Sequence, residues 1–368
     1  MSVYINLISI YLSLFTKLFT QMKNLRHLSS AELVSLVAQL DEKPYRAKQI
    51  EEWIWKKGAS SIDDMSNLSK PIREKLKAEY SLNKLEIDHT QISDDTTIKN
   101  RFVLHDGPFV EGVLIPTPHR MTACVSSQVG CSLSCKFCAT GYMDRKRNLD
   151  FDEIYDQVMH LNQQAEANYN QHLSNIVFMG MGEPLLNYAN VLKAIEKISS
   201  PEGMGMSPSR ITVSTAGVSK MIKKLADDKV KFNLAVSLHA ANDTKRNEIM
   251  PINETNNLKA LIESLNYFYK ATKSPITFEY ILFANFNDSI EDADDLIKIC
   301  RQVPSKVNII EYNPIELASF AKPDEEKVDA FMQYLDRNKV NARLRRSRGK
   351  DIDAACGQLA NIDHPVKP

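Results

Sequence analysis

Hydrophobic and polar positions change their pattern at about residue 84. Before it, apolar residues recur three or four positions apart, as on amphipathic helices. Ser29 and Glu32 form a capping box ahead of the first run, and the second run, 44–58, begins with proline and ends with glycine. A third run covers 63–80. We therefore predict three helices in a small N-terminal helical domain.

From residue 85 to 115 the runs become short and alternating, as in strands. Asp106-Gly107 is a turn signal between 101–104 and 109–115, so a β-hairpin is expected there. Further on, strand and helix patterns alternate. Strands are predicted at 122–126, 175–179, 210–214, 232–237, 276–282, 306–312 and 340–346, with helices at 151–163, 191–199, 258–272 and 325–338. The predicted fold class is α/β, a partial (β/α)6 barrel that is open and parallel.

These patterns give a predicted division of the chain. It comprises a leader at 1–21, a helical accessory domain at 22–84, a β-hairpin extension at 85–120, the barrel at 121–360 and a tail at 361–368. The leader is apolar, but it lacks a cationic start and a cleavage site, and Lys17 interrupts it. We expect it not to be a signal peptide, and a weak membrane anchor is the less favoured alternative.

The composition of the 368 residues is that of an ordinary globular protein, with 43% hydrophobic and 25% charged residues. The formal net charge is zero, which excludes bulk attraction to nucleic acid and leaves only local basic patches for a polyanion. Six cysteines without paired spacing indicate a reducing compartment, in which thiols act as ligands or nucleophiles.

Three of the cysteines, Cys131, Cys135 and Cys138, lie within eight residues. Thiolates at this spacing can each bind one iron of a [4Fe-4S] cluster, which leaves the fourth iron without a protein ligand. An open iron suits the amino and carboxylate groups of S-adenosylmethionine, whose sulfonium one electron can cleave to a carbon radical. Structural thiols and a zinc ribbon with Cys124 as fourth ligand are the alternatives, but the ribbon lacks a second C-x2-C pair.

Polar and glycine residues follow the ends of the predicted barrel strands, where parallel βα barrels hold their working groups. Gly182 and Glu183 follow the second strand, so that backbone approaches a ligand closely and a carboxylate meets the ammonium of the cosubstrate. The other candidates are Ser214, Ser237 with Leu238 and His239, and Asn313, which offer neutral hydrogen-bonding groups suited to ribose and adenine.

Two further candidates lie outside this rim. Glu111 shares a strand face with Phe109 and Val113, so its carboxylate is expected to face an apolar space, to have a raised proton affinity and to act as a base. An edge-strand glutamate in water explains the pattern as well. Cys356 lies in a loop of small residues after the last strand that can reach the barrel mouth, and a buried inert thiol is the alternative.

Five segments give a specific resemblance. They are Cys124-Val-Ser-Ser-Gln-Val-Gly-Cys131, Gly180-Met-Gly-Glu-Pro-Leu-Leu-Asn187, Ser237-Leu-His-Ala240, Tyr312-Asn-Pro314 and Asp351-Ile-Asp-Ala-Ala-Cys-Gly-Gln-Leu359. The chain resembles the radical S-adenosylmethionine enzymes, and within them the RNA adenine-C2 methyltransferases of the RlmN type, over about 24–360. The resemblance implies one [4Fe-4S] cluster and S-adenosyl-L-methionine as cofactors, with two cosubstrate molecules used per turnover.

The same resemblance implies roles for three residues. A methyl group first goes to Cys356, and a 5′-deoxyadenosyl radical takes a hydrogen atom from it. The methylene radical adds to carbon 2 of adenine, an electron-poor carbon that cannot itself displace a sulfonium methyl. Glu111 then removes the carbon 2 proton, and Cys124 attacks the sulfur of Cys356 to release methylated RNA and leave a disulfide.

The implied substrates are an adenosine of large-subunit (23S) ribosomal RNA and the adenosine beside the anticodon of certain transfer RNAs. The implied partners are a flavodoxin-like electron donor and a thiol that reduces the Cys124–Cys356 disulfide. We expect a cytoplasmic monomer without stable membrane association. The basic residues expected to contact phosphates are Arg145, Lys146, Arg147, Arg343, Arg345, Arg346, Arg348 and Lys350, although Arg343 and Arg345 also fit one solvated face of a strand.

Two other functions remain open. The sister family that methylates carbon 8 of the same ribosomal adenosine shares the cysteines, although Pro184 after Glu183 favours the carbon 2 family. A non-catalytic RNA-binding module stabilised by zinc or a cluster is the second alternative, and it predicts no turnover.

Overall fold

The computed structural model describes residues 22–361, so the predicted leader at 1–21 and positions 362–368 of the predicted tail lie outside it. The chain folds into two compact units. One consists of the chain up to Lys84 together with Glu202–Met204, and the other of Leu85–Pro201 together with the chain from Gly205. Among the described residues, no helix is both long and apolar enough to cross a membrane.

The N-terminal unit contains the three predicted helices, α2 (Ser30–Gln39), α3 (Tyr45–Glu51) and α4 (Lys70–Glu79). The capping box is confirmed, because the Ser29 hydroxyl accepts from the Glu32 amide and the Glu32 carboxylate accepts from the Ser29 amide. The third helix is shorter than predicted. Pro71 lies in its first turn, and a helix begun at residue 63 would place this proline in its interior, where the ring clashes with the preceding turn.

The larger unit is built on a sheet of ten strands in the order β14-β13-β12-β11-β10-β9-β6-β5-β4-β3. The strands are β3 (Glu86–Ile92), β4 (Ile98–Val103), β5 (Phe109–Thr117), β6 (Arg120–Cys124), β9 (Asn175–Phe178), β10 (Ile211–Thr215), β11 (Asn233–Ser237), β12 (Ile276–Leu282), β13 (Ser305–Glu311) and β14 (Ala342–Arg345). Within this sheet the seven strands β6, β9, β10, β11, β12, β13 and β14 are parallel to one another. The strands β3, β4 and β5 pair antiparallel, and β5 pairs antiparallel with β6. The predicted open, parallel barrel with a hairpin extension is confirmed.

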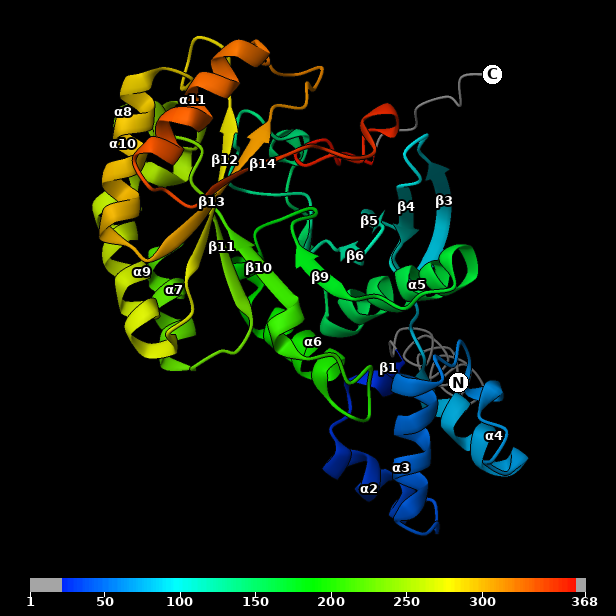
Figure 1. Cartoon of the computed structure of the whole chain (residues 1–368). Helices are drawn as coiled ribbons and strands as arrows, with labels where there is room; N and C mark the ends of the chain where they lie inside the picture. The colour runs from blue at the N-terminus through cyan, green and yellow to red at the C-terminus, as the bar shows by residue number, and fades with distance from the viewer. Residues whose placement is uncertain (1–21, 362–368) are drawn as a thin grey trace, which may run out of the picture. The chain divides into compact units, whose positions relative to one another are not determined.

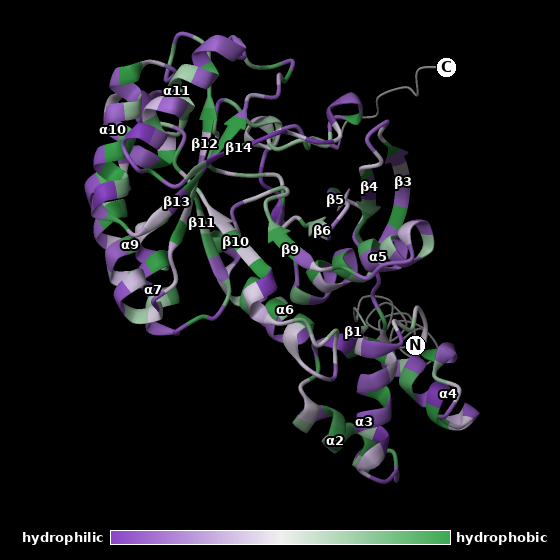
Figure 2. Ribbon diagram, in the orientation of Figure 1, coloured by the Kyte–Doolittle hydropathy of each residue, from purple (hydrophilic) through white to green (hydrophobic). Residues whose placement is uncertain are grey.

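Helices cover the outer side of the parallel strands, as Figure 1 shows for α7, α9, α10 and α11. The helices are α5 (Phe151–Tyr169), α6 (Tyr188–Ser199), α7 (Ser219–Asp227), α8 (Asp243–Ile249), α9 (Leu258–Thr272), α10 (Ile290–Gln302) and α11 (Glu325–Arg337). These helices alternate between apolar and polar residues, whereas the central strands are mostly apolar (Figure 2). All seven residues of β12 are buried, as expected of a parallel strand covered on both faces.

Candidate active site

One cavity lies at the carboxyl ends of the parallel strands, the position at which βα barrels hold their sites. Its lining includes Cys131, Cys135 and Cys138 after β6, Gly180, Gly182 and Glu183 after β9, Ser214 and Thr215 of β10, Ser237 and His239 from β11, Glu279 and Ile281 of β12, Ile310 of β13, Arg345 of β14, and Cys356. The structure thus brings nine of the thirteen predicted site residues to one cavity. Of the described residues predicted for the site, Glu111, Cys124, Leu238 and Asn313 do not line it.

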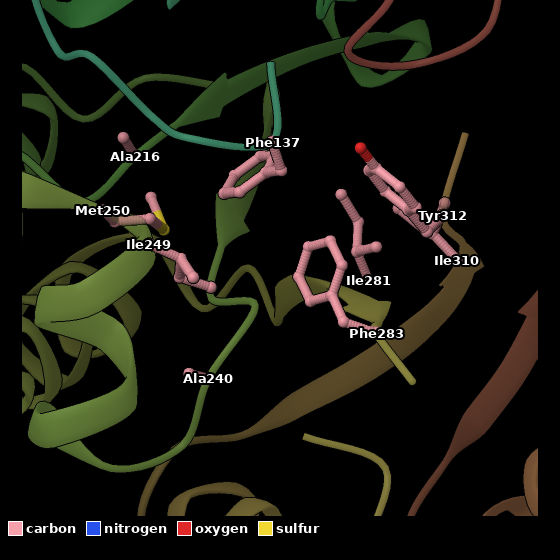
Figure 3. Close-up of a cluster of buried hydrophobic side chains, with 9 residues drawn as sticks. All are labelled: Phe137, Ala216, Ala240, Ile249, Met250, Ile281, Phe283, Ile310 and Tyr312. Atoms are coloured by element: carbon pink, nitrogen blue, oxygen red, sulfur yellow. The ribbon is translucent and has the colours of Figure 1, made fainter. Parts of the chain in front are cut away.

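The three-cysteine loop is anchored on an apolar cluster beneath the cavity. Phe137, between the second and third cysteines, packs with Ile281 and Phe283 in this cluster, which Figure 3 shows. The backbone N–H of Lys136 donates to the carbonyl of Ile249 over 3.0 Å. The apolar contacts therefore fix the loop while its thiols stay at the cavity wall.

The distances between candidate ligand atoms bear on the zinc alternative. Four sulfurs around one zinc lie about 3.8 Å apart, as Zn–S bonds of about 2.3 Å in a tetrahedron require. Within residues 22–361, no set of three ligand atoms within 4.8 Å of one another includes a cysteine. Burial raises the pKa of Cys131 to about 11, and it also raises the pKa of Cys135 and Cys138. The described thiols are thus not gathered as closely as the ligands of a single zinc ion.

Gly182 and Glu183 contact Gln128, which lies three residues before Cys131. Gly182 has φ +92°, and a Cβ there would meet the Cβ of Gln128 at 2.4 Å, so only glycine fits. The Glu183 carboxylate accepts from the amides of Leu185 at 3.0 Å and Ala216 at 2.8 Å. Burial nevertheless raises the pKa of Glu183. A buried carboxylate in this position is suited to a cationic group of a ligand.

His239 and Asn313 offer neutral polar groups beside the cavity. Burial lowers the pKa of His239 to about 3, so its ring is neutral near pH 7. Its Nδ1 accepts from the Ile281 amide at 3.1 Å, which leaves the proton on Nε2. The Asn313 amide donates to the Cys356 carbonyl at 3.3 Å, while its buried Oδ1 has no hydrogen-bond partner within the described chain. That unpaired oxygen is suited to a donor of a bound ligand.

Cys356 and Cys124 lie within electrostatic reach of each other. Cys124 ends β6 and is 7% exposed; burial, followed by the charge of Cys356, raises the pKa of Cys124 to about 12. Arg345 lines the cavity, and its pKa is raised first by Cys356, against burial, and further by Glu279 and Cys124. Arg345 was expected to contact phosphate, and its position in the cavity wall was not predicted.

Glu111 is buried as expected, but its surroundings are polar. One carboxylate oxygen accepts from the amides of Ala360 at 2.9 Å and Asn361 at 3.2 Å, and the other lies 3.6 Å from the ammonium of Lys99. The expectation of an apolar space was wrong because Lys99, on the neighbouring strand β4, is itself 4% exposed and lies against the carboxylate. The edge-strand alternative is also wrong, since β5 pairs with both β4 and β6.

Several of the basic residues expected to contact phosphates are paired with carboxylates. Arg147 contacts Asp106 at 2.6 Å and Glu153 at 2.7 Å. Arg346 and Lys350 both contact Glu311, and Arg348 lies 3.4 Å from Asp95. Three residues of the predicted basic patch, Arg346, Arg348 and Lys350, therefore pair the chain after β14, which carries Cys356, with carboxylates.

The Glu311 carboxylate, at the end of β13, forms salt bridges with three basic side chains, Lys322, Arg346 and Lys350. Burial alone would raise its pKa, but hydrogen bonds from Lys350, Lys322 and Arg346 outweigh burial and lower the pKa to about 2. We expect Glu311→Gln to lower the thermal unfolding midpoint at pH 7 by about 3–8 °C. Because the folded-state pKa is depressed, this stability is present above the unfolded-state pKa and is lost as pH falls toward 2.

Thermal unfolding at several pH values tests this expectation. The difference between wild type and Glu311→Gln should narrow as the pH falls from 6 to 3. Glu325→Gln is the matched control, because Glu325 lies 3.8 Å from the same Arg346 but its side chain is 79% exposed. A difference that stays constant over this range, or a control with the same effect, would contradict the role of Glu311.

Comparisons with known proteins agree with this geometry. Residues 23–82 match the ribosomal RNA large subunit methyltransferase N-terminal domain, and residues 125–297 match the radical SAM superfamily. A protein of Cytophaga hutchinsonii described as a probable dual-specificity RNA methyltransferase RlmN is 57% identical over 338 residues, 92% of this chain and 93% of that protein. The dual-specificity RNA methyltransferase RlmN of an Anaeromyxobacter species is 42% identical over 94% of this chain and 92% of its own.

The fold is also similar to that of a solved radical SAM methyltransferase. The crystal structure of a radical SAM methyltransferase from Sphaerobacter thermophilus has a TM-score of 0.87 and 39% identity, and the match covers 92% of this chain and 99% of that one. Two family models, full-length relatives and a shared fold therefore place the chain in one group. It belongs to the RlmN family of radical S-adenosylmethionine methyltransferases.

Proposed function

We propose that this protein methylates carbon 2 of an adenosine in large-subunit ribosomal RNA and of the adenosine beside the anticodon in certain transfer RNAs. The relatives named dual-specificity RNA methyltransferases support RNA as the substrate. The observation that carries the proposal is the position of Cys356, which lines the same cavity as the three cysteines of the 131–138 loop. A thiol there can carry a methyl group between the cofactors and a base.

The cofactors of this superfamily are one [4Fe-4S] cluster and S-adenosylmethionine. When bound, they supply a carbon radical by one-electron cleavage of the sulfonium. In our proposal Cys131, Cys135 and Cys138 bind the cluster. The residues proposed to bind S-adenosylmethionine are Gly182, Glu183, Ser214, Ser237, Leu238, His239 and Asn313. Leu238 is fully buried, its backbone N–H donates to Glu279 and its carbonyl accepts from Arg246.

Cys356 acts first in the proposed reaction. Its thiolate would accept the sulfonium methyl group of one S-adenosylmethionine molecule, with S-adenosylhomocysteine as the leaving group. A carrier is needed because carbon 2 of adenine is electron-poor and cannot displace a sulfonium methyl directly. The methyl group on Cys356 then gives up a hydrogen atom and forms a bond to carbon 2, so that the RNA is covalently attached to the protein. In the proposed order, each turnover uses two molecules of S-adenosylmethionine.

Glu111 and Cys124 complete the proposed reaction. Glu111 removes the proton from carbon 2, and one electron would return from the adduct to the cluster, so that no unpaired electron remains on the RNA. Glu111 accepts hydrogen bonds from the amides of Ala360 and Asn361, so the end of the Cys356 loop reaches it. Cys124 attacks the sulfur of Cys356 and releases the RNA, which leaves a disulfide. A thiol reductant must then restore both cysteines, and a flavodoxin-like protein is the proposed electron donor. The proposed setting is the cytoplasm, where thiols stay reduced.

An anaerobic turnover assay tests the proposal. Holoenzyme, reductant and S-adenosylmethionine are incubated with ribosomal RNA and with transfer RNA, and the nucleosides are identified by mass spectrometry. We expect 2-methyladenosine from both. Methylation at carbon 8 would indicate the sister reaction, and a lack of both methylated RNA and 5′-deoxyadenosine would favour the RNA-binding module.

A further inference from the structure

The segment that carries Cys356 has little regular structure of its own. From residue 346 to 361, which we call the Cys356 segment, the secondary structure is one short turn at Lys350–Ile352. Contacts with other parts of the chain must therefore determine where Cys356 lies. Figure 1 shows this segment running from β14 toward the hairpin of β3 and β4. The loop between those two strands, residues 93–97, is called the hairpin loop below.

The first contact is made by Asp351 of the Cys356 segment. Its carboxylate accepts from the hydroxyl of Ser93 and, at 3.0 Å, from the backbone amide of Asp94. Burial alone would raise the pKa of Asp351, yet these two hydrogen bonds lower it. Hydrogen bonds to an ionised carboxylate are about twice as strong as neutral ones, so this contact is a firm attachment.

In the second contact the hairpin loop supplies the carboxylate and the Cys356 segment supplies the amide. The carboxylate of Asp95, in the hairpin loop, accepts from the backbone amide of Gly349 at 2.9 Å. The Arg348 guanidinium donates to the Asp95 carbonyl at 2.7 Å. Each loop thus supplies an aspartate that accepts an amide hydrogen of the other loop, and neither can move without breaking both pairs.

The two loops also approach closely. Gly349 has φ +65°, and a Cβ at this position would lie 3.0 Å from the Thr97 side chain and 2.7 Å from that of Ala354. Thr97 is fully buried. The contact therefore requires glycine both for its backbone conformation and for the space between the loops.

We infer that the hairpin loop is a positioning element for Cys356, with Ser93 and Asp95 of that loop and Asp351 as the positioning residues. The inference rests on the proposed role of Cys356 as the methyl carrier. Asp351 precedes Cys356 by only five residues, so the attachment limits the volume that the thiol can explore. Holding it near Cys124 and the cavity raises its effective concentration toward both.

Asp95→Ala and Asp351→Ala test the inference in the holoenzyme. Hydrogen exchange in the Cys356 segment should become about tenfold faster in each variant, because a charge-assisted hydrogen bond is lost. Disulfide formation between Cys124 and Cys356 is measured with diamide, which takes two electrons and two protons from the thiols, and it should slow about tenfold. The kcat for RNA methylation should fall about tenfold or more, with the KM for RNA unchanged.

Asp94→Ala is the matched control, since Asp94 takes part in the contact through its backbone amide only. It should behave as wild type in all three measurements. Asp351→Asn keeps the shape and one acceptor oxygen, and it should recover part of the lost disulfide rate. Iron content, measured in each variant, should match that of wild type.

Two outcomes would overturn the inference. One is wild-type exchange and disulfide rates in both alanine variants. The other is a rise in the KM for RNA at unchanged kcat, which would make the hairpin loop a part of the RNA surface. Exchange and disulfide rates need no RNA turnover, so they distinguish this inference from the proposed function. If the variants change the exchange and disulfide rates as expected but wild type makes no methylated RNA, only the proposed function is contradicted.

Discussion

Cys356→Ala is expected to abolish RNA methylation, with a fall in turnover on the order of 10⁴ or more, as for the loss of other covalent nucleophiles. The reason is that Cys356 is the only described thiol that lines the cavity apart from the three thiols of the 131–138 loop. The variant should keep its cluster, because the proposed ligands are untouched. Methylated adenosine in RNA digests, measured by mass spectrometry after anaerobic turnover, checks the expectation.

Cys300→Ala is the control for this experiment. Cys300 is a half-buried thiol on α10, and it does not line the cavity. Because it lies outside the cavity, it has no part in the proposed reaction. This variant should methylate RNA at the wild-type rate. Methylated RNA from Cys356→Ala at a rate near that of Cys300→Ala would refute the role of Cys356 as methyl carrier.

Cys124→Ala is expected to stop the reaction one step later. Without a thiol to attack the sulfur of Cys356, the RNA stays covalently attached to the protein. The protein should therefore accumulate as an RNA adduct that withstands denaturation, up to one RNA per protein, while released methylated RNA falls to a small fraction of the wild-type amount. Denaturing gel electrophoresis with labelled RNA measures the adduct, and peptide mapping locates it.

The same variant separates two roles for Cys124. Its iron content should equal that of wild type, because Cys124 lies outside the 131–138 loop and ends a buried strand. Cys124→Ala combined with Cys356→Ala should form no adduct. A loss of iron in Cys124→Ala would make this cysteine a cluster ligand and would remove the resolving thiol from the account.

The fold was predictable because its elements have strong local signals. Buried parallel strands such as β12 are mostly apolar, although Thr277 and Glu279 interrupt the run. The capping box of Ser29 and Glu32 marks a helix start. The predicted start of the third helix was wrong, because Pro71 is accepted only in the first turn and α4 therefore begins at Lys70. The third antiparallel strand, β3, was not singled out, since six of its seven residues are exposed and carry no apolar stripe.

The site residues were predictable where reactive or polar residues directly follow a predicted parallel strand. The cysteine loop and the residues after β9, β10 and β11 reach one cavity because the carboxyl ends of parallel strands share an edge. The surroundings of Glu111 and Arg345 depend on partners in other elements. These are Lys99 of the neighbouring hairpin strand and Ala360 near the end of the chain for Glu111, and Glu279 of β12 for Arg345. No periodicity in the sequence reports such pairs.

The most direct test of the central claim follows the hydrogens of the transferred methyl group. Turnover in ordinary water with S-adenosylmethionine that carries a trideuteromethyl group should yield methyladenosine with two deuterium atoms in its new methyl group. One deuterium leaves when the group on Cys356 is activated, and the last hydrogen comes from solvent. A product that keeps all three deuterium atoms would contradict transfer through a methylene group on Cys356.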